Sequence, residues 1–386
     1  MSKVTSYQGL VNEQAKAAVR VSGAHHSSWN GRQIASAPDR KVRGAVTWNN
    51  TIEYNDEKVT APLREMFANA RVYNQDQETL QWYREAMKTT FHENVHLLAA
   101  EGSDHHDAMQ AYASISGLRP LEEGITEVYS YNNLNAYIDD LGLEEIAPGI
   151  RSAPANPSYR EFTPAAQTFA DSIGRRSEIG SGEVVRRMAV VNAEQKFRVA
   201  AEIIYDNSEL PGLVPEDQRA AAVQRIEASM RPPFARINDL STSDRAQLRR
   251  QSAVAGAQAA NAGYAEVRTL REQWTRSAPE VGRGATQQQS QEAQKQGPQQ
   301  SAHAEEPLSV YGRQSTQQAE HGPRGIAQDG QHPQQQAPPR ELQHAMHAGL
   351  SGTAPMSGVK RLRPDQLGTR RGGAQTAQRQ GPEREV

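Results

Sequence analysis

The chain has 386 residues, enough for one large domain or two of ordinary size. Only 36% of the residues are hydrophobic, which is low for a fully globular protein of this length, so part of the chain is expected to remain outside any core. The formal net charge of -2 gives no general attraction to nucleic acid or to an anionic membrane surface. Because cysteine is absent, disulfide frameworks, cysteine-based zinc fingers and thiol nucleophiles are excluded.

Targeting segments are not evident in the sequence. No stretch approaches the roughly 18 consecutive apolar residues that a membrane span needs, and residues 1–8 lack the apolar centre of a secretory signal peptide. We therefore expect a cytoplasmic protein, or one exported without a cleavable signal peptide, and no membrane partner.

Composition divides the chain into three predicted regions. Residues 1–157 hold most of the tryptophan and tyrosine and combine alternating with helical patterns. Residues 158–277 are rich in alanine, arginine, glutamine and glutamate, and they predict helices that break at Pro211–Gly212 and Pro232–Pro233. Residues 278–386 are rich in glutamine, proline and glycine. Such a segment cannot offset an ordering entropy of about 1–2 kcal/mol per residue, so we predict a disordered tail.

The first clear pattern is an alternation of apolar and polar residues from Val46 to Tyr54. A period of two predicts a strand, or a hairpin that turns at Asn49–Asn50. If this strand lies at the edge of a cleft, its backbone can pair with an extended substrate. The alternative is an ordinary core strand.

Two helical patterns follow. Apolar residues recur at spacings of three and four from Leu80 to Leu98, and Gly102 suits the C-terminal stop. The same spacing runs from Leu121 to Leu141, with Pro120 near the start and Gly142 after the end. The predicted order is therefore strand, helix, linker, helix.

The first predicted helix contains an H-E-x-x-H motif, from His92 through Glu93 to His96. Residues four apart lie on one helix face, so both imidazoles can reach one cation. Glu93 is offset by one position, close enough to touch a water molecule beside the metal without ligating the metal. Zinc is the expected ion because imidazole and carboxylate ligands suit it. Glu93 is then the expected general base.

The second predicted helix carries Glu122, Glu123 and Gly124, with Glu127 one turn later. Together with the H-E-x-x-H motif, this segment resembles the gluzincin metallopeptidases, whose second zinc helix has two polar or acidic residues, a small residue and a later acidic residue. The resemblance covers His92 to Glu127. It implies a zincin-like fold, Glu123 as the third zinc ligand, and Glu127 as the residue that orients a ligand histidine.

Other residues compete for roles in this site. Asp104, His105 and His106 are alternative third ligands, although a polar loop after the helix is the favoured interpretation of that segment. Attack on an amide also requires a donor for the developing oxyanion. The tyrosine candidates for that donor are Tyr112, Tyr129 and Tyr131.

The predicted tail contains a basic cluster, made of Lys360, Arg361, Arg363, Arg370 and Arg371. Because aromatic residues that could stack on bases do not alternate with it, we interpret it as a solvated charge run and do not expect nucleic acid as a partner. The tail is a candidate binding segment for an unidentified protein partner.

The sequence as a whole predicts an α+β protein. We expect a small N-terminal β-sheet with an active-site helix, then a mostly helical lobe and the disordered tail. The predicted function is zinc-dependent hydrolysis of a peptide or protein substrate. Two alternatives are a non-catalytic helical scaffold or binding protein with a disordered interaction tail, and a toxin or effector protease of zincin fold.

Overall fold

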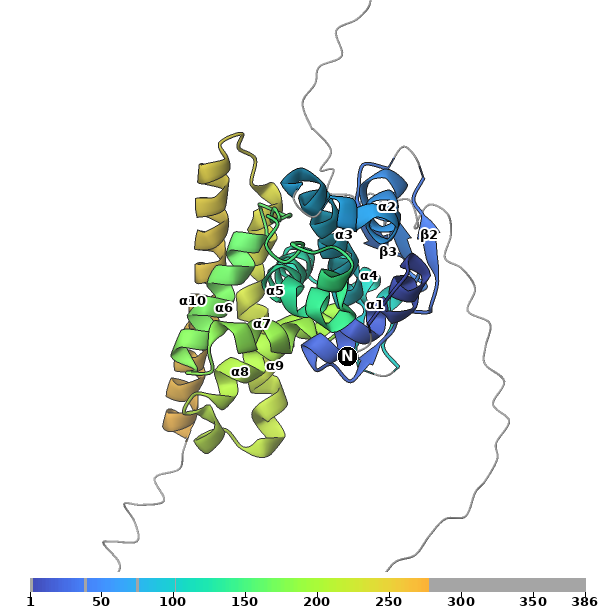
Figure 1. Ribbon diagram of the computed structural model, residues 1–386. Helices are drawn as coiled ribbons and strands as arrows, with labels where there is room; N and C mark the ends of the chain where they lie inside the picture. Colours follow the sequence, from blue (N-terminus) through green and yellow to red (C-terminus); the bar gives the residue numbers. More distant parts are fainter. Residues whose placement is uncertain (1–2, 38–39, 74–75, 101, 278–386) are drawn as a thin grey trace, which may run out of the picture. The chain divides into compact units, whose positions relative to one another are not determined.

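Helices dominate the described part of the chain, where the strands are short and lie in its N-terminal portion (Figure 1). The computed structural model describes residues 3–37, 40–73, 76–100 and 102–277, which belong to one compact unit. The α+β class with a small N-terminal sheet and a helical C-terminal lobe is therefore confirmed. The predicted tail, residues 278–386, lies outside the described residues.

The strands form two small sheets. Strand β4 (Ile52–Tyr54) lies between β2 (Gln33–Ala35), which runs parallel to it, and β3 (Gly44–Val46), which runs antiparallel. Within the described residues β3 therefore forms one edge of the three-stranded sheet. The second sheet pairs β1 (His26–Ser27) with β5 (Leu98–Ala99).

The alternating segment from Val46 to Tyr54 folds as a hairpin, one of the two predicted forms. The N–H of Thr47 donates to the carbonyl of Thr51 at 2.9 Å, which closes the turn around Asn49–Asn50. Asn50 has φ 63°, a left-handed conformation that asparagine tolerates better than most residues.

Among the described residues up to Leu141, the chain forms five α-helices. Their bounds are α1 Tyr7–Ser22, α2 Ala61–Asn69, α3 Gln77–His96, α4 His105–Ser114 and α5 Leu118–Leu141, and a π-helical segment at Asp56–Thr60 precedes α2. Helices α3 and α5 pack against each other. Phe91 of α3 stacks on Tyr137 of α5, with ring centroids 4.2 Å apart. This contact holds the two predicted site helices together.

The end of α3 and the start of α4 differ from the sequence prediction. Helix α3 stops at His96, and Leu98–Ala99 leave the helix to pair with β1, so tertiary pairing overrides the helical period. The predicted polar loop at 104–106 is also wrong. Asp104 caps α4 by accepting a hydrogen bond from Asp107 N at 3.1 Å, and His105 is only 3% exposed.

Helix α5 extends three residues before the predicted start at Leu121 and ends at Leu141 as predicted, before Gly142 at φ 70°. Gly124 faces α6 at close range. A Cβ atom at Gly124 would lie 2.7 Å from Cβ of Ala166 and 3.0 Å from the carbonyl oxygen of Phe162. The small residue after Glu123 therefore allows close packing of α5 on the helical lobe.

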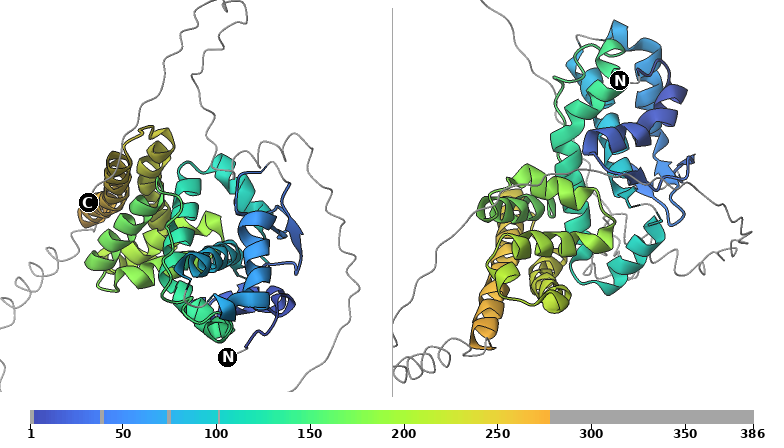
Figure 2. Two further views of the ribbon diagram at one scale, coloured as in Figure 1. Left: turned by 45° about the horizontal axis from the view of Figure 1, so that its top comes forward. Right: turned by 90° about the horizontal axis from the view of Figure 1, so that it is seen from below.

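The later helices pack around α5 and along α10 (Figure 2). Their bounds are α6 Thr163–Arg176, α7 Ser181–Ala189, α8 Lys196–Asp206, α9 Glu216–Ala235 and α10 Arg245–Ser277. One buried hydrophobic cluster extends from α1 to α10. No helix among the described residues is long and apolar enough to cross a membrane.

The two predicted helix breaks have different outcomes. Pro211–Gly212 lies in a short 3-10 turn between α8 and α9, which confirms that break. Pro232–Pro233 does not interrupt α9, which continues to Ala235. Phe234 is fully buried, with its ring 5.2 Å from that of Phe169 and 5.6 Å from that of Phe197. Packing of this ring holds the last turn in helical form.

Candidate metal centre

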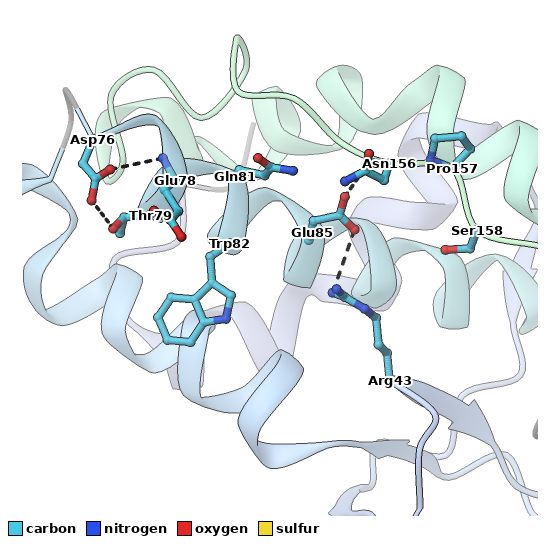
Figure 3. Close-up of a pocket in the computed structure, with 10 residues that line it drawn as sticks. All are labelled: Arg43, Asp76, Glu78, Thr79, Gln81, Trp82, Glu85, Asn156, Pro157 and Ser158. Atoms are coloured by element: carbon cyan, nitrogen blue, oxygen red, sulfur yellow. Dashed lines mark hydrogen bonds and ion pairs between the residues drawn. The ribbon is translucent and has the colours of Figure 1, made fainter. Parts of the chain in front are cut away.

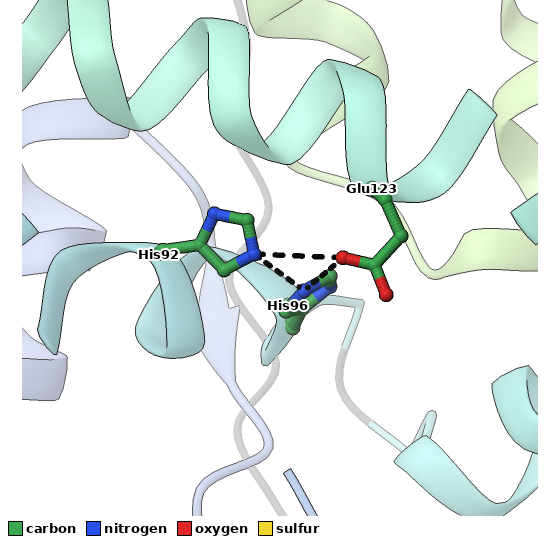
Figure 4. Close-up of side chains that lie close together, drawn as sticks. All are labelled: His92, His96 and Glu123. Carbon is green, nitrogen blue, oxygen red and sulfur yellow. Dashed lines mark hydrogen bonds and ion pairs between the residues drawn. The ribbon is translucent and has the colours of Figure 1, made fainter. Parts of the chain in front are cut away.

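The last turn of α3 presents both motif histidines to α5. His92 and His96 lie one turn apart on α3, and their side chains are 6% and 7% exposed. Glu123 projects from α5 toward them (Figure 4). The structure thus brings together His92, His96 and Glu123, and these three residues are called the ligand triad below.

The three facing atoms of the ligand triad have the spacing of ligands that share one ion. His96 Nε2 lies 3.1 Å from His92 Nε2. Glu123 Oε2 lies 3.6 Å from His92 Nε2 and 3.5 Å from His96 Nε2. For metal–ligand distances of about 2.0–2.1 Å, tetrahedral ligands are separated by about 3.3–3.4 Å. These residues could therefore hold a metal ion.

The carboxylate oxygen of Glu123 in this cluster is a buried acceptor in need of a partner. Among the described residues, Glu123 Oε2 has no hydrogen-bond donor, and the Glu123 side chain is 3% exposed. A buried carboxylate oxygen without a donor is costly. A cation shared with the two imidazoles would satisfy it, so the donor set fits a metal on this observation.

A second carboxylate faces the other ring nitrogen of each histidine. His92 Nδ1 lies 3.0 Å from Glu127 Oε2, and His96 Nδ1 lies 2.7 Å from Glu122 Oε1. A carboxylate on Nδ1 fixes the orientation of the ring and leaves Nε2 free to bind a metal. The position of Glu127 agrees with its predicted role, whereas Glu122 was not predicted as an orienting residue.

The charges around the two histidines do not balance while both imidazoles are neutral. Each of the six side chains concerned is at most 5% exposed; they are Glu93, Glu122, Glu123, Glu127, Lys88 and Lys196. Four carboxylates against two ammonium groups leave two formal negative charges when the histidines are neutral. Because buried charge is stable only when compensated, a divalent cation matches the deficit.

Protons on the two histidines can supply the same two positive charges. Burial disfavours a charged imidazole, but the neighbouring carboxylates of Glu123 and Glu127 outweigh it and raise the pKa of His92 to about 8. Burial likewise opposes charge on His96, and the carboxylates of Glu122 and Glu123 raise that pKa to about 10. Burial favours the neutral acid at Glu123, yet the two histidines lower its pKa well below the ordinary range.

The side chain of Glu93 lies between its own helix, α3, and the edge strand β3. Its side chain is buried, and burial raises its pKa above the ordinary value. A Cβ atom at Gly44 of β3 would lie 2.6 Å from Glu93 Oε1 and 2.8 Å from its Cγ. Only glycine leaves room for this carboxylate against the strand.

Of the alternative ligands, His105 lies beside His96 without joining the ligand triad. Its ring lies 6.3 Å from that of His96, centroid to centroid, and neither ring nitrogen has a hydrogen-bond partner in the described part of the chain. Burial, and then the charge of His96, lower the pKa of His105 to about 3. His106 instead bonds Gln110 at 2.8 Å, and Asp104 caps α4.

The three tyrosine candidates differ in their surroundings. Tyr129 donates to the carbonyl of Val21 at 3.3 Å, and Tyr131 donates to that of Ala155 at 3.4 Å. Only Tyr112 keeps its hydroxyl buried with no partner among the described residues. Burial, followed by the charges of the carboxylates on α5, raises its pKa well above the ordinary value.

Comparison with known proteins gives no relative. No protein-family model, curated protein or solved structure matches the chain significantly. The site is therefore interpreted from its own residues.

Tyr159 contacts the ligand triad and was missed in the sequence. Its ring stacks on that of His92 at 5.3 Å and 10°, and burial, followed by the charge of Glu123, raises the pKa of its hydroxyl well above the ordinary value. It adopts φ 47°, an unusual conformation for a tyrosine. It lies in the connection between α5 and α6, where no periodic pattern marks it. One weak indication of Lys88 was present in the sequence, because this residue lies four positions before His92 and so on the same face of the predicted helix.

A surface pocket of about 630 Å³ lies along the first half of α3 (Figure 3). Trp82, which is 41% exposed, lines it together with Arg43 and Ser158. Arg43 directly precedes Gly44, and the N–H of Ser158 donates to Glu127 Oε1 at 2.6 Å. The pocket therefore begins within one or two residues of the groups that contact the ligand histidines and Glu93.

Proposed function

We propose that this protein is a zinc-dependent peptidase that hydrolyses a peptide or protein substrate. The observation that carries the proposal is the convergence of His92 Nε2, His96 Nε2 and the unpartnered Glu123 Oε2 at 3.1–3.6 Å. Two nitrogen ligands and one carboxylate oxygen are a donor set that suits zinc and leaves a position open for water.

Glu93 is the residue proposed to move the proton. Zinc bound by the ligand triad would polarise the scissile carbonyl and lower the pKa of a water molecule to about 7. Glu93 accepts the proton of the attacking water and delivers it to the leaving amine as the C–N bond breaks. Burial raises the pKa of Glu93, which makes it a stronger base for this proton.

Strand β3 is proposed to bind the substrate backbone. The residues that flank β3 bond toward β4. Asn55 N donates to Arg43 O at 2.8 Å, and Thr47 N donates to Thr51 O at 2.9 Å. Because the ladder alternates, the peptide groups of Gly44 and Val46 face the other edge. An extended substrate paired there would pass beside Glu93. The pocket lined by Trp82 offers space for one of its side chains.

His105 and Tyr112 are proposed to donate hydrogen bonds to the oxyanion that forms during attack. Both carry buried polar atoms without partners among the residues described. Their rings lie 6.4 Å apart, and His105 is beside His96. Such donors act strongly in a buried site because water does not compete with them.

The test is hydrolysis of casein and of a mixed peptide library by zinc-loaded Glu93→Gln protein. We expect one zinc per chain as in the wild type and a turnover at least about 10²-fold lower, since general-base catalysis typically contributes 10²–10⁴. Glu57→Gln, at an exposed position, is the control and keeps full activity. Near-normal turnover of zinc-replete Glu93→Gln protein would refute the assignment.

A further inference from the structure

Each ligand histidine belongs to a chain of three side chains that ends in a buried lysine. One chain runs from His92 through Glu127 to Lys88, whose Nζ lies 3.1 Å from Glu127 Oε1. The other runs from His96 through Glu122 to Lys196, whose Nζ lies 3.1 Å from Glu122 Oε2. Lys196 is the first residue of α8 in the helical lobe.

The ammonium group of Lys196 has three oxygen neighbours. It donates to the carbonyl of Met188 at 2.8 Å and to that of Val191 at 3.3 Å, and it forms an ion pair with Glu122 Oε2 at 3.1 Å. The side chain is 1% exposed, so water does not replace any of them. Lys196 therefore joins the α7–α8 connection to the carboxylate that orients His96.

The two chains connect the site to different parts of the fold. Lys88 lies on α3, as His92 does, and it also donates to Ser158 Oγ at 2.8 Å and to the carbonyl of Asn156. Lys196 is separated from its histidine in sequence and reaches the site only when α8 packs against α5. The orientation of His96 thus depends on the helical lobe.

We infer that Lys196 is a positioning residue of the metal centre, acting through Glu122 on His96, and that α8 is part of the site. Without its ammonium group, Glu122 becomes a buried carboxylate with one counter-charge fewer, and it holds His96 Nδ1 less firmly. Coupling is reciprocal, so a metal on His96 also stabilises the packing of α8. The inference rests on the metal-binding part of the proposed function and not on peptide hydrolysis.

Lys196→Met in the full chain is the direct test, with Lys16→Met as the matched control because Lys16 is 65% exposed. Zinc affinity is measured by competition with a chelator, and ligand geometry is measured by the visible spectrum of the Co²⁺ form. We expect Lys196→Met to lower zinc affinity about 10–100-fold, as the loss of residues that support metal ligands does. Its Co²⁺ spectrum should shift. The control should match the wild type in both readouts.

A double variant separates positioning from stability. In Glu122→Gln with Lys196→Met no charge of this pair is left buried alone, so the melting temperature should recover toward the wild type. The zinc affinity should remain at least about tenfold below the wild type, because His96 has lost its carboxylate. If affinity recovers together with the melting temperature, Lys196 has a structural role only and the inference is overturned.

Hydrogen exchange of the wild-type chain needs no substitution. Adding zinc should slow exchange in α8 and near Met188 as well as in α3 and α5. Protection confined to α3 and α5, or a folded Lys196→Met protein with wild-type affinity and spectrum, would overturn the coupling alone. A wild-type chain that binds no zinc would overturn the coupling and the proposed function together.

Discussion

Gly44→Ala is expected to impair catalysis while leaving the metal site intact. Gly44 lies on β3 against the carboxylate of Glu93, and the three atoms nearest to an added Cβ all belong to Glu93. An added methyl group would lie 2.6 Å from Glu93 Oε1, 2.8 Å from Cγ and 2.9 Å from Cδ. The flexible member of this contact is the Glu93 side chain, so the carboxylate moves and the strand stays.

The size of the effect follows from that displacement. Ordinary contact begins at 3.4 Å, so the carboxylate must withdraw by about 0.8 Å. Misplacing a catalytic group by about 1 Å can cost about 10²-fold in rate. We therefore expect kcat to fall about 10–100-fold. The melting temperature should change by only a few degrees, because alanine also restricts the unfolded chain, which offsets part of the contact.

The assay compares zinc-loaded Gly44→Ala with Gly182→Ala, a position with no atom within 4 Å of the added methyl group. Peptide hydrolysis, zinc content and melting temperature are measured for both. Unchanged kcat in a folded, zinc-replete Gly44→Ala protein would show that the carboxylate of Glu93 does not act where the structure places it. Loss of zinc with loss of activity would show that the strand supports the metal site instead.

Three further predictions concern the ligands, the protons and the oxyanion donors. In zinc titrations Glu123→Ala should abolish tight binding, Glu127→Ala should weaken it about 10–100-fold, and His105→Ala with His106→Ala should leave it nearly intact; the reverse order would place the third ligand on α4. Zinc affinity should fall by at least about tenfold per pH unit from about pH 8 to pH 6, because zinc must displace the protons that the ligand histidines hold in this range. The neighbouring carboxylates overcome burial and raise the pKa of these two histidines, to about 8 and about 10; an affinity that is flat over this range in calorimetry would contradict this. Tyr112→Phe should lower kcat about tenfold or more with unchanged zinc content, and equal kcat would remove Tyr112 from the mechanism.

The fold was predictable where the pattern is local. The period of two before Asn50 and the period of 3.6 in α5 both depend on neighbouring residues, and both elements formed. The end of α3 was not predictable, because Leu98–Ala99 leave the helix to pair with a strand about 70 residues earlier in the chain. The same reason applies to Pro232–Pro233, where a buried Phe234 holds the helix.

In the candidate site as well, local relations were predictable and contacts made only by tertiary packing were not. His92 and His96 were placed together because a helix relates residues four apart, and Glu123 followed from the resemblance of its helix to a known zinc helix. Lys196 could not be found in this way, since its contact with α5 exists only after the lobe packs. His105 was misassigned because its segment reads as polar, although the folded chain buries it beside His96.

The central claim is that the ligand triad holds one metal ion. Elemental analysis of the purified full chain, with His96→Ala prepared in parallel, tests it most directly. We predict about one zinc per chain in the wild type and almost none in His96→Ala, because two ligands alone hold zinc weakly. A metal-free wild type, as the scaffold alternative predicts, or a His96→Ala protein that keeps its zinc, would contradict the account.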